Sequence, residues 1–134
     1  MKILAPILTA LVLCACTPDP KDVSAVELLK DNQKWHDTYV RTCGLVLAAT
    51  CRLKVCPEGT PPPDVPQCSA ISEIHLSTTS AVCPSSGRDF WAHIDGRFIA
   101  LEPGGEFNDK NRFVIGKANV GPVNEPCLVP RSGT

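Results

Sequence analysis

Cysteine is the residue type with the most chemical potential in this sequence. Eight cysteines occur among 134 residues, and Cys14 and Cys16 lie in an apolar N-terminal stretch. The other six are spread through the rest of the chain: Cys43, Cys51, Cys56, Cys68, Cys83 and Cys127. Their sulfur atoms could bind a metal or pair as disulfides. Zinc sites commonly contain a C-x-x-C pair or histidines at ligand spacing, and the sequence has neither. We therefore predict three disulfides, with a metal site as the alternative.

Histidine offers a second route to catalysis or metal binding. His36, His75 and His93 are the only histidines, and none lies in a known catalytic motif. His75 and His93 fall on expected strands, where Asp89 or Asp95 could complete a site of two histidines and one carboxylate. We favour the simpler interpretation, in which these histidines are surface or half-buried residues without a ligand.

Two further motifs lack the features of catalytic loops. The turn sequence Pro84-Ser85-Ser86-Gly87 does not contain the G-x-S-x-G pattern of a nucleophile elbow. Gly104-Gly105 lacks the glycine spacing of a phosphate-binding loop. We therefore predict that the protein is not an enzyme and that it uses no cofactor and no metal.

The N-terminal stretch has the pattern of an export signal. Lys2 supplies a positive charge, and residues 3–12 form an apolar run that is well short of the ~20 residues of a membrane-spanning helix. The run ends in Leu13-Cys14-Ala15-Cys16, which resembles the lipobox of bacterial lipoproteins, although Cys14 departs from the usual small or aliphatic residue. The resemblance implies removal of residues 1–15 and lipidation of Cys16, including palmitate-type chains. An ordinary secretory signal with an incidental cysteine is the alternative.

The lipobox resemblance also implies a location. Lipoproteins of the inner membrane commonly carry Asp after the lipidated cysteine, and this chain has Thr17. We therefore expect a lipid anchor in the outer membrane, with the protein facing the periplasm. An even number of cysteines in an exported chain is typical of a disulfide framework, which agrees with the six cysteines downstream.

Composition and charge limit the number of domains and the kinds of partner. Residues 16–22 read as a lipidated tether, and residues 23–134 are long enough for a single globular domain with an irregular C-terminal tail. Thirteen Lys and Arg stand against fourteen Asp and Glu, a net charge of −1, with no block of like charge. Nucleic-acid binding depends on neutralising phosphates, so we expect no nucleic-acid partner.

One helix and several short strands are expected. Ser24 and Glu27 match a capping box, which predicts a helix from Ser24 to about Gln33. Trp35 follows it and is expected to pack on the core rather than anchor a partner. Strands are expected at residues 38–54, 69–79, 90–101 and 112–120, the third being either one strand or a hairpin turning at Asp95-Gly96. Gly44 suggests a bulge or bend, and residues 55–67 form a proline-rich loop. The fold class is mainly β, a small barrel or sandwich stapled by disulfides.

A hairpin around the proline loop suggests one pattern of disulfides. If residues 43–54 and 69–82 pair antiparallel, the sum of paired residue numbers stays nearly constant. Cys56–Cys68 and Cys43–Cys83 satisfy this condition, which leaves Cys51–Cys127 to join the tail to the sheet. This pairing is one of fifteen possible connectivities.

The order of elements between Val26 and Val46 resembles the start of small exported proteins with an OB-type barrel. In that pattern a short helix leads through Tyr39-Val40 and Gly44-x-Val46 into a bent first strand. The resemblance implies ligand binding on the face of the second and third strands. For an exported, acidic chain we expect a protein, peptide or glycan ligand. The large aromatics expected to be partly exposed, although each is more simply a core residue, are Trp35, Phe90, Trp91 and Phe107.

Two function classes follow. The first is an envelope lipoprotein that acts as a non-catalytic binding or accessory module, with the lipid bilayer and an envelope protein or glycan as its partners. The alternative is an immunity or conjugal entry-exclusion lipoprotein, because residues 26–51 also resemble short plasmid exclusion lipoproteins with a helix and two cysteines.

Overall fold

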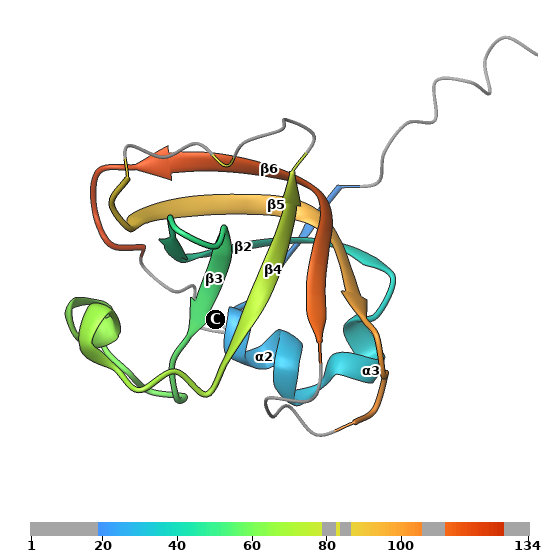
Figure 1. Ribbon diagram of the computed structural model, residues 1–134. Helices are drawn as coiled ribbons and strands as arrows, with labels where there is room; N and C mark the ends of the chain where they lie inside the picture. The colour runs from blue at the N-terminus through green and yellow to red at the C-terminus, as the bar shows by residue number, and fades with distance from the viewer. Residues whose placement is uncertain (1–18, 79–82, 84–86, 106–111, 128–134) are drawn as a thin grey trace, which may run out of the picture.

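The chain folds into a β-barrel with short helices at one end (Figure 1). The computed structural model describes residues 19–78, 83, 87–105 and 112–127. The strands are β1 (Lys21–Asp22), β2 (Thr38–Leu47), β3 (Arg52–Val55), β4 (Ser72–Thr78), β5 (Phe90–Ala100) and β6 (Phe113–Val123). The helices are α2 (Ala25–Lys30), α3 (Asn32–Trp35) and the 3₁₀ helix η2 (Pro62–Gln67).

Strands β2 to β6 close on themselves. The order along the sheet is β1-β2-β3-β4-β6-β5, and β5 pairs with β2 to complete the ring. β2, β3 and β4 form an antiparallel meander, and β4 and β6 run parallel. β1 adds a short parallel pairing at the open edge of β2. The prediction of a mainly β, OB-like barrel is therefore confirmed.

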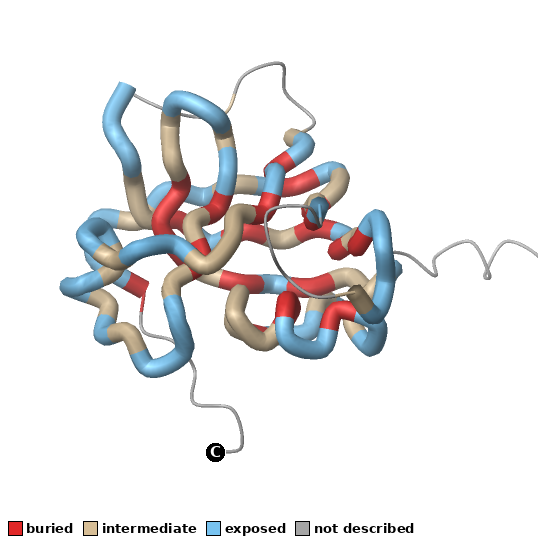
Figure 2. The backbone as a smooth tube through the Cα atoms, turned by 60° about the horizontal axis from the view of Figure 1, so that its bottom comes forward, coloured by how far each residue is buried: buried red, intermediate tan, exposed pale blue. Residues whose placement is uncertain are grey.

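The core fills the inside of this barrel (Figure 2). Alternate residues of β5 point inward, and Ile94, Phe98 and Ala100 are essentially inaccessible, as their shared parity predicted. Phe98 and Phe113 stack with ring centroids 6.0 Å apart. Leu28 and Leu29 of α2 are fully buried and close one end of the barrel.

The helix begins where the sequence predicted but ends earlier. The Ser24 hydroxyl accepts a hydrogen bond from the Glu27 backbone N–H at 3.3 Å, so the cap is confirmed. α2 ends at Lys30, and a separate turn, α3, continues to Trp35. Trp35 packs against the core, and Lys34 Nζ lies 4.9 Å from the centroid of its ring. The core position expected for Trp35 is confirmed.

The structure shows the roles of two glycines, Gly96 and Gly44. Of the two expectations for residues 90–101, one strand or a hairpin, the single strand is confirmed. Asp95-Gly96 is not a hairpin turn, because β5 runs unbroken from Phe90 to Ala100 and Gly96 pairs with Val40. A Cβ on Gly96 would lie 2.8 Å from the Gly116 carbonyl oxygen and 2.5 Å from the Ile115 side chain, so glycine allows β6 to approach closely. Gly44 forms no bulge with β5, since the register continues through it.

The disulfide framework is present, with one of the three predicted pairs. Cys56–Cys68 is confirmed, whereas the other bridges join Cys43 to Cys127 and Cys51 to Cys83. The error came from treating residues 43–54 as one strand. The chain turns back at residues 48–51, so Cys43 lies on β2, opposite His93 of β5, and only β3 pairs with β4. With all six cysteines in disulfides, the alternative of a cysteine metal site does not hold.

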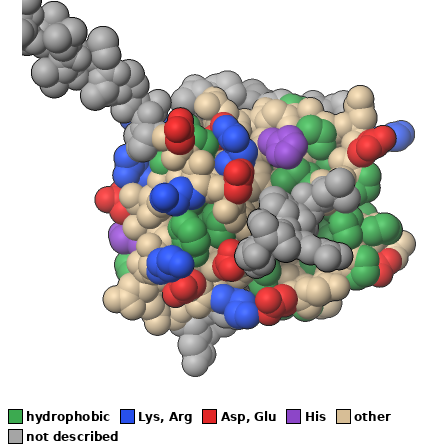
Figure 3. Space-filling model, turned by 180° about the vertical axis from the view of Figure 1, so that it is seen from behind, with side chains coloured by type: hydrophobic (Ala, Val, Ile, Leu, Met, Phe, Trp, Pro, Cys, Tyr) green, Lys and Arg blue, Asp and Glu red, His purple; other side chains and the backbone are tan. Residues whose placement is uncertain are grey.

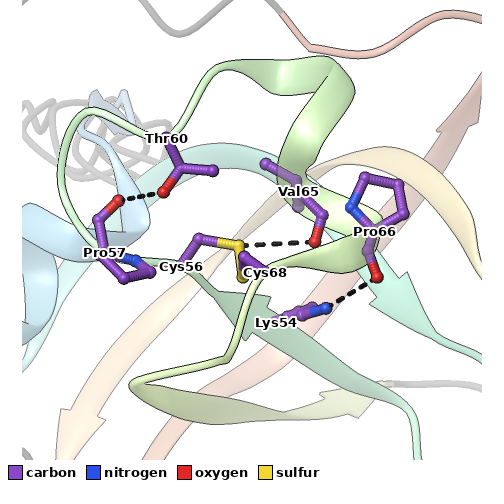
Figure 4. The surroundings of a disulfide bond; sticks show 7 residues. All are labelled: Lys54, Cys56, Pro57, Thr60, Val65, Pro66 and Cys68. Atoms are coloured by element: carbon purple, nitrogen blue, oxygen red, sulfur yellow. Dashed lines mark hydrogen bonds between the residues drawn. A yellow bond between two sulfur atoms is a disulfide. The ribbon is translucent and has the colours of Figure 1, made fainter.

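The proline-rich segment between β3 and β4 is held by its disulfide and by local hydrogen bonds (Figure 4). Lys54 Nζ donates to the Pro66 carbonyl at 3.0 Å, and Thr60 Oγ1 donates to the Pro57 carbonyl at 2.6 Å. η2 occupies its second half, where the sequence predicted only a loop. These contacts give the segment a defined structure beside the barrel.

Candidate functional site

The three histidines lie apart and serve different roles. His36 Nδ1 accepts a hydrogen bond from the Ala100 backbone N–H at 3.1 Å, which is a structural contact between α3 and β5. His75 pairs with Val114 of β6, whereas His93 pairs with Gly121 of the same strand. Seven residues along a strand span roughly 23 Å. The hypothetical metal site of two histidines is therefore wrong.

Acidic residues do not supply an alternative centre within the described ranges. Asp95 Oδ1 accepts from Arg41 Nε at 3.1 Å, and Asp89 Oδ1 accepts from the Ala48 backbone N–H at 3.0 Å. The hydrogen bond with Asp95 is the main cause that raises the pKa of Arg41. Among the residues that the structure describes, no group of three or more His, Cys, Asp or Glu side chains could hold a metal ion.

A groove of about 750 Å³ lies on the outer face of β3, β4 and β6, and we call it the β4 groove. Ile74 and Leu76 are buried inside the barrel, so Glu73 and His75 point outward from β4. Arg52 lies directly across from His75 in the register. The residues that line the groove are Arg52, Ala70, Ser72, Glu73, His75, Leu101, Arg112, Phe113 and Val114.

The β4 groove combines basic groups with one apolar side chain. Arg52 Nη1 lies 3.5 Å from Glu73 Oε1, a weak, solvent-exposed ion pair. Arg112 contributes a second guanidinium, and its backbone carbonyl accepts from the Leu101 N–H at 3.0 Å. Leu101 is 54% exposed, the one large hydrophobic residue so exposed in the described part of the chain. Two arginines against one glutamate leave an excess of positive charge among the lining side chains, which favours an anionic ligand.

The groove has no arrangement for acid–base or nucleophilic chemistry among described residues. Among the described residues, no hydrogen bond joins the His75 side chain to a hydroxyl or a carboxylate. The side chains present can bind charge and cover an apolar group, because guanidinium groups form strong paired hydrogen bonds with carboxylates. The groove is therefore suited to recognition.

No protein-family model, curated protein or solved structure matches this chain. No matched protein is therefore available for comparison with the geometry of the site. Cys16, the predicted lipidation site, lies outside the described residues, as does Phe107. Within the described residues, none of the helices has the length and hydrophobicity required to span a bilayer.

The predicted aromatic residues do not gather in the β4 groove. Phe90 and Trp35 are partly buried and pack against the core. Trp91 of β5 is half-buried and lines a second cavity, between α2, β2 and the proline-rich segment. The groove residues that sequence reasoning missed, Arg52 and Arg112, carry no local signal, because the pairing of distant strands brings them together.

The surface charge agrees with the composition. On the face seen in Figure 3, basic and acidic side chains are interspersed instead of forming a patch of one sign. The described ion pairs are on the surface, such as Lys30 Nζ to Glu58 Oε2 at 2.7 Å and Arg97 Nη1 to Asp37 Oδ1 at 3.0 Å. The hydrogen bond to Glu58 is the main cause that raises the pKa of Lys30.

Proposed function

We propose that this protein is a lipid-anchored lipoprotein of the bacterial envelope that works as a non-catalytic binding module. Its ligand is a carboxylate-bearing segment of an envelope protein or an acidic glycan, bound in the β4 groove. The anchor is Cys16, and the protein faces the periplasm from the outer membrane. The observation that supports the binding role is the groove itself, which is lined by Arg52, His75, Arg112 and the exposed Leu101.

The position of the groove supports the same proposal. In OB-type barrels the second and third strands carry the ligand. Here these strands correspond to β3 and β4, which supply Arg52, Glu73 and His75. A lipid anchor removes the need for a membrane-binding surface, because two or more acyl chains hold a protein durably on a bilayer. The groove is then free to face a partner.

The anchor is tested by the mass of the protein purified from a bacterial membrane. We expect a chain that starts at Cys16 and carries the added mass of its acyl chains. The Cys16→Ser variant should lack that mass and should leave the membrane fraction. A wild-type protein that still begins at Met1 would refute the lipoprotein assignment.

The binding role is tested by crosslinking the full-length protein in intact cells. We expect Arg52→Ala and Arg112→Ala, alone and together, to reduce crosslinking to an envelope protein or glycan. Arg88→Ala is the matched control, because Arg88 is an exposed arginine that does not line the groove. Equal crosslinking by the double variant and by wild type would refute the role of the groove. Enzymatic removal of glycan or of protein from the crosslinked product identifies the ligand class.

A further inference from the structure

A second cavity, of about 660 Å³, opens where β2 and β3 separate, and we call it the β2–β3 cleft. The two strands pair only at Val46–Leu53 and Leu47–Arg52. Beyond these pairs, residues 43–45 and 54–56 line the cleft. The start of α2, the proline-rich segment, Trp91 and Cys127 complete its walls.

The edge of β2 that faces this cleft is covered at both ends but not in the middle. β1 covers Val40 and Arg41, and β3 covers Val46 and Leu47. Among the described residues no strand pairs with residues 43–45 on this edge. A short length of strand edge is therefore available inside a cavity, where a second strand could add to it.

The backbone of β2 points its polar groups into the cleft. The N–H and C=O of one strand residue face the same edge, and successive residues face opposite edges. Val23 N–H donates to the Arg41 carbonyl at 3.0 Å, so the backbone groups of Arg41 face away from β5. Those of Cys43 and Leu45, two and four residues further on, face the same way.

The backbone of β3, on the opposite side of the cleft, also directs polar groups into it. Ile71 N–H donates to the Val55 carbonyl at 2.9 Å, so the backbone groups of Val55 face β4. The neighbouring Lys54 therefore directs its backbone groups toward β2. The cleft presents strand backbone on two sides, which suits an extended chain and would not suit a helix.

The two charged side chains that line the cleft, Lys54 and Glu58, already have partners within the protein. Glu58 is paired with Lys30, and Lys54 Nζ is held by the Pro66 carbonyl. The remaining surface is largely apolar, with Leu45, Val55 and Trp91 among the lining residues. An uncharged peptide is therefore favoured here, in contrast to the anionic ligand expected in the β4 groove.

We propose that the β2–β3 cleft binds an extended, uncharged peptide segment of a partner protein, which adds as a short strand to β2 at residues 43–45. A segment of three to five residues matches the free edge at about 3.3 Å per residue. The peptide places an apolar side chain against Trp91 and leaves alternate side chains toward solvent. This site is separate from the β4 groove and does not depend on its proposed function.

The test uses a display library of random heptapeptides selected on the full-length protein, followed by synthesis of the enriched peptides. Each is compared with versions in which a single backbone nitrogen is methylated, because methylation removes one hydrogen-bond donor. We expect methylation at every second residue to lower affinity about tenfold and at the residues between to have little effect. Amide signals of Cys43 and Leu45 should shift and become protected from exchange on binding.

Several results would overturn the proposal. These are a selection with no enriched peptide, insensitivity to methylation at all positions, or amide shifts confined to the β4 groove. Protection of the Cys43 and Leu45 amides without peptide would also overturn it, because the cleft would then be filled by the chain itself. Arg88→Ala is the control variant, since Arg88 is exposed and lines neither the cleft nor the β4 groove, and it should leave peptide affinity unchanged.

Discussion

The side chain of Asn32 holds the backbone of Gly104. Asn32 Oδ1 accepts from the Gly104 N–H at 2.7 Å, and its Nδ2 donates to the carbonyls of Leu29 and Gly105 at 2.9 and 3.0 Å. Asn32 is 3% exposed, and its bonds to Gly104 and Gly105 fix the turn after β5 to the helical end of the barrel. Gly104 has a φ of +85°, a conformation that glycine adopts without strain.

This relationship predicts that Asn32→Asp destabilises the protein. The carboxylate keeps the acceptor for Gly104 but loses both donors, and it brings a negative charge beside the carbonyl oxygens of Leu29 and Gly105. We expect a loss of about 1–3 kcal/mol in the free energy of unfolding, measured by urea denaturation. Asn124→Asp, the same chemical change at an exposed asparagine, is the control and should be nearly neutral. Equal effects of the two changes would contradict the assigned role.

Gly96 should be far less tolerant of alanine than Gly116. A Cβ at Gly96 meets backbone at 2.8 Å, which cannot move aside without disturbing the β5–β6 pairing. At Gly116 the nearest atom is the Arg97 carbonyl oxygen at 3.8 Å, an ordinary contact. We expect Gly96→Ala to cost about 1–3 kcal/mol and Gly116→Ala to cost little, by thermal or urea unfolding. Similar stability of both variants would argue against close packing at Gly96.

Removing the unpaired hydroxyl inside the barrel should stabilise the fold. Thr42 is 3% exposed, and its Oγ1 has no hydrogen-bond partner among the residues that the structure describes. Thr42→Val keeps the shape and removes the buried polar atom, so we expect a gain of about 1 kcal/mol. Thr42→Ser keeps the hydroxyl and loses the methyl group, so it should be less stable than wild type. The prediction fails if valine lowers the unfolding free energy.

The three disulfides should contribute unequally. They join residues 84, 32 and 12 positions apart, for Cys43–Cys127, Cys51–Cys83 and Cys56–Cys68 respectively. By loop-closure entropy, loss of the first should cost about 1.7 kcal/mol more than loss of the last. The comparison uses double alanine variants of each pair in urea unfolding. The reverse order would show that local packing around Cys56–Cys68 outweighs chain entropy.

Local patterns in the sequence predicted the elements well. The Ser24 cap, the parity of Ile94 and Phe98 and the hairpin enclosing Cys56 and Cys68 all depend on neighbours close in sequence, and the structure confirms them. The small barrel or sandwich was expected from several short strands with closely spaced turns, and its OB-like form from the resemblance of residues 26–46.

Long-range features could not be predicted in the same way. Gly96 resembled a turn residue, but its role depends on the approach of β6, which is determined by tertiary packing. Cys43 and Cys127 meet because β2 and β5 pair and the chain after β6 returns beside them. Likewise Arg52 and Arg112 share a groove only through the pairing of β3, β4 and β6.

The parallel pairing of β1 with β2 limits the distance between the barrel and the lipid anchor that we propose. Lys21 is paired with Val40, and it is the fifth residue after Cys16 in the sequence. An extended chain reaches at most about 3.6 Å per residue, so Lys21 stays within about 18 Å of the lipid attachment that we propose, and β2 lies about 5 Å beyond it. If Cys16 is lipidated as we propose, this segment is shorter than a bilayer is thick, and a ligand of the barrel would be bound close to the membrane surface.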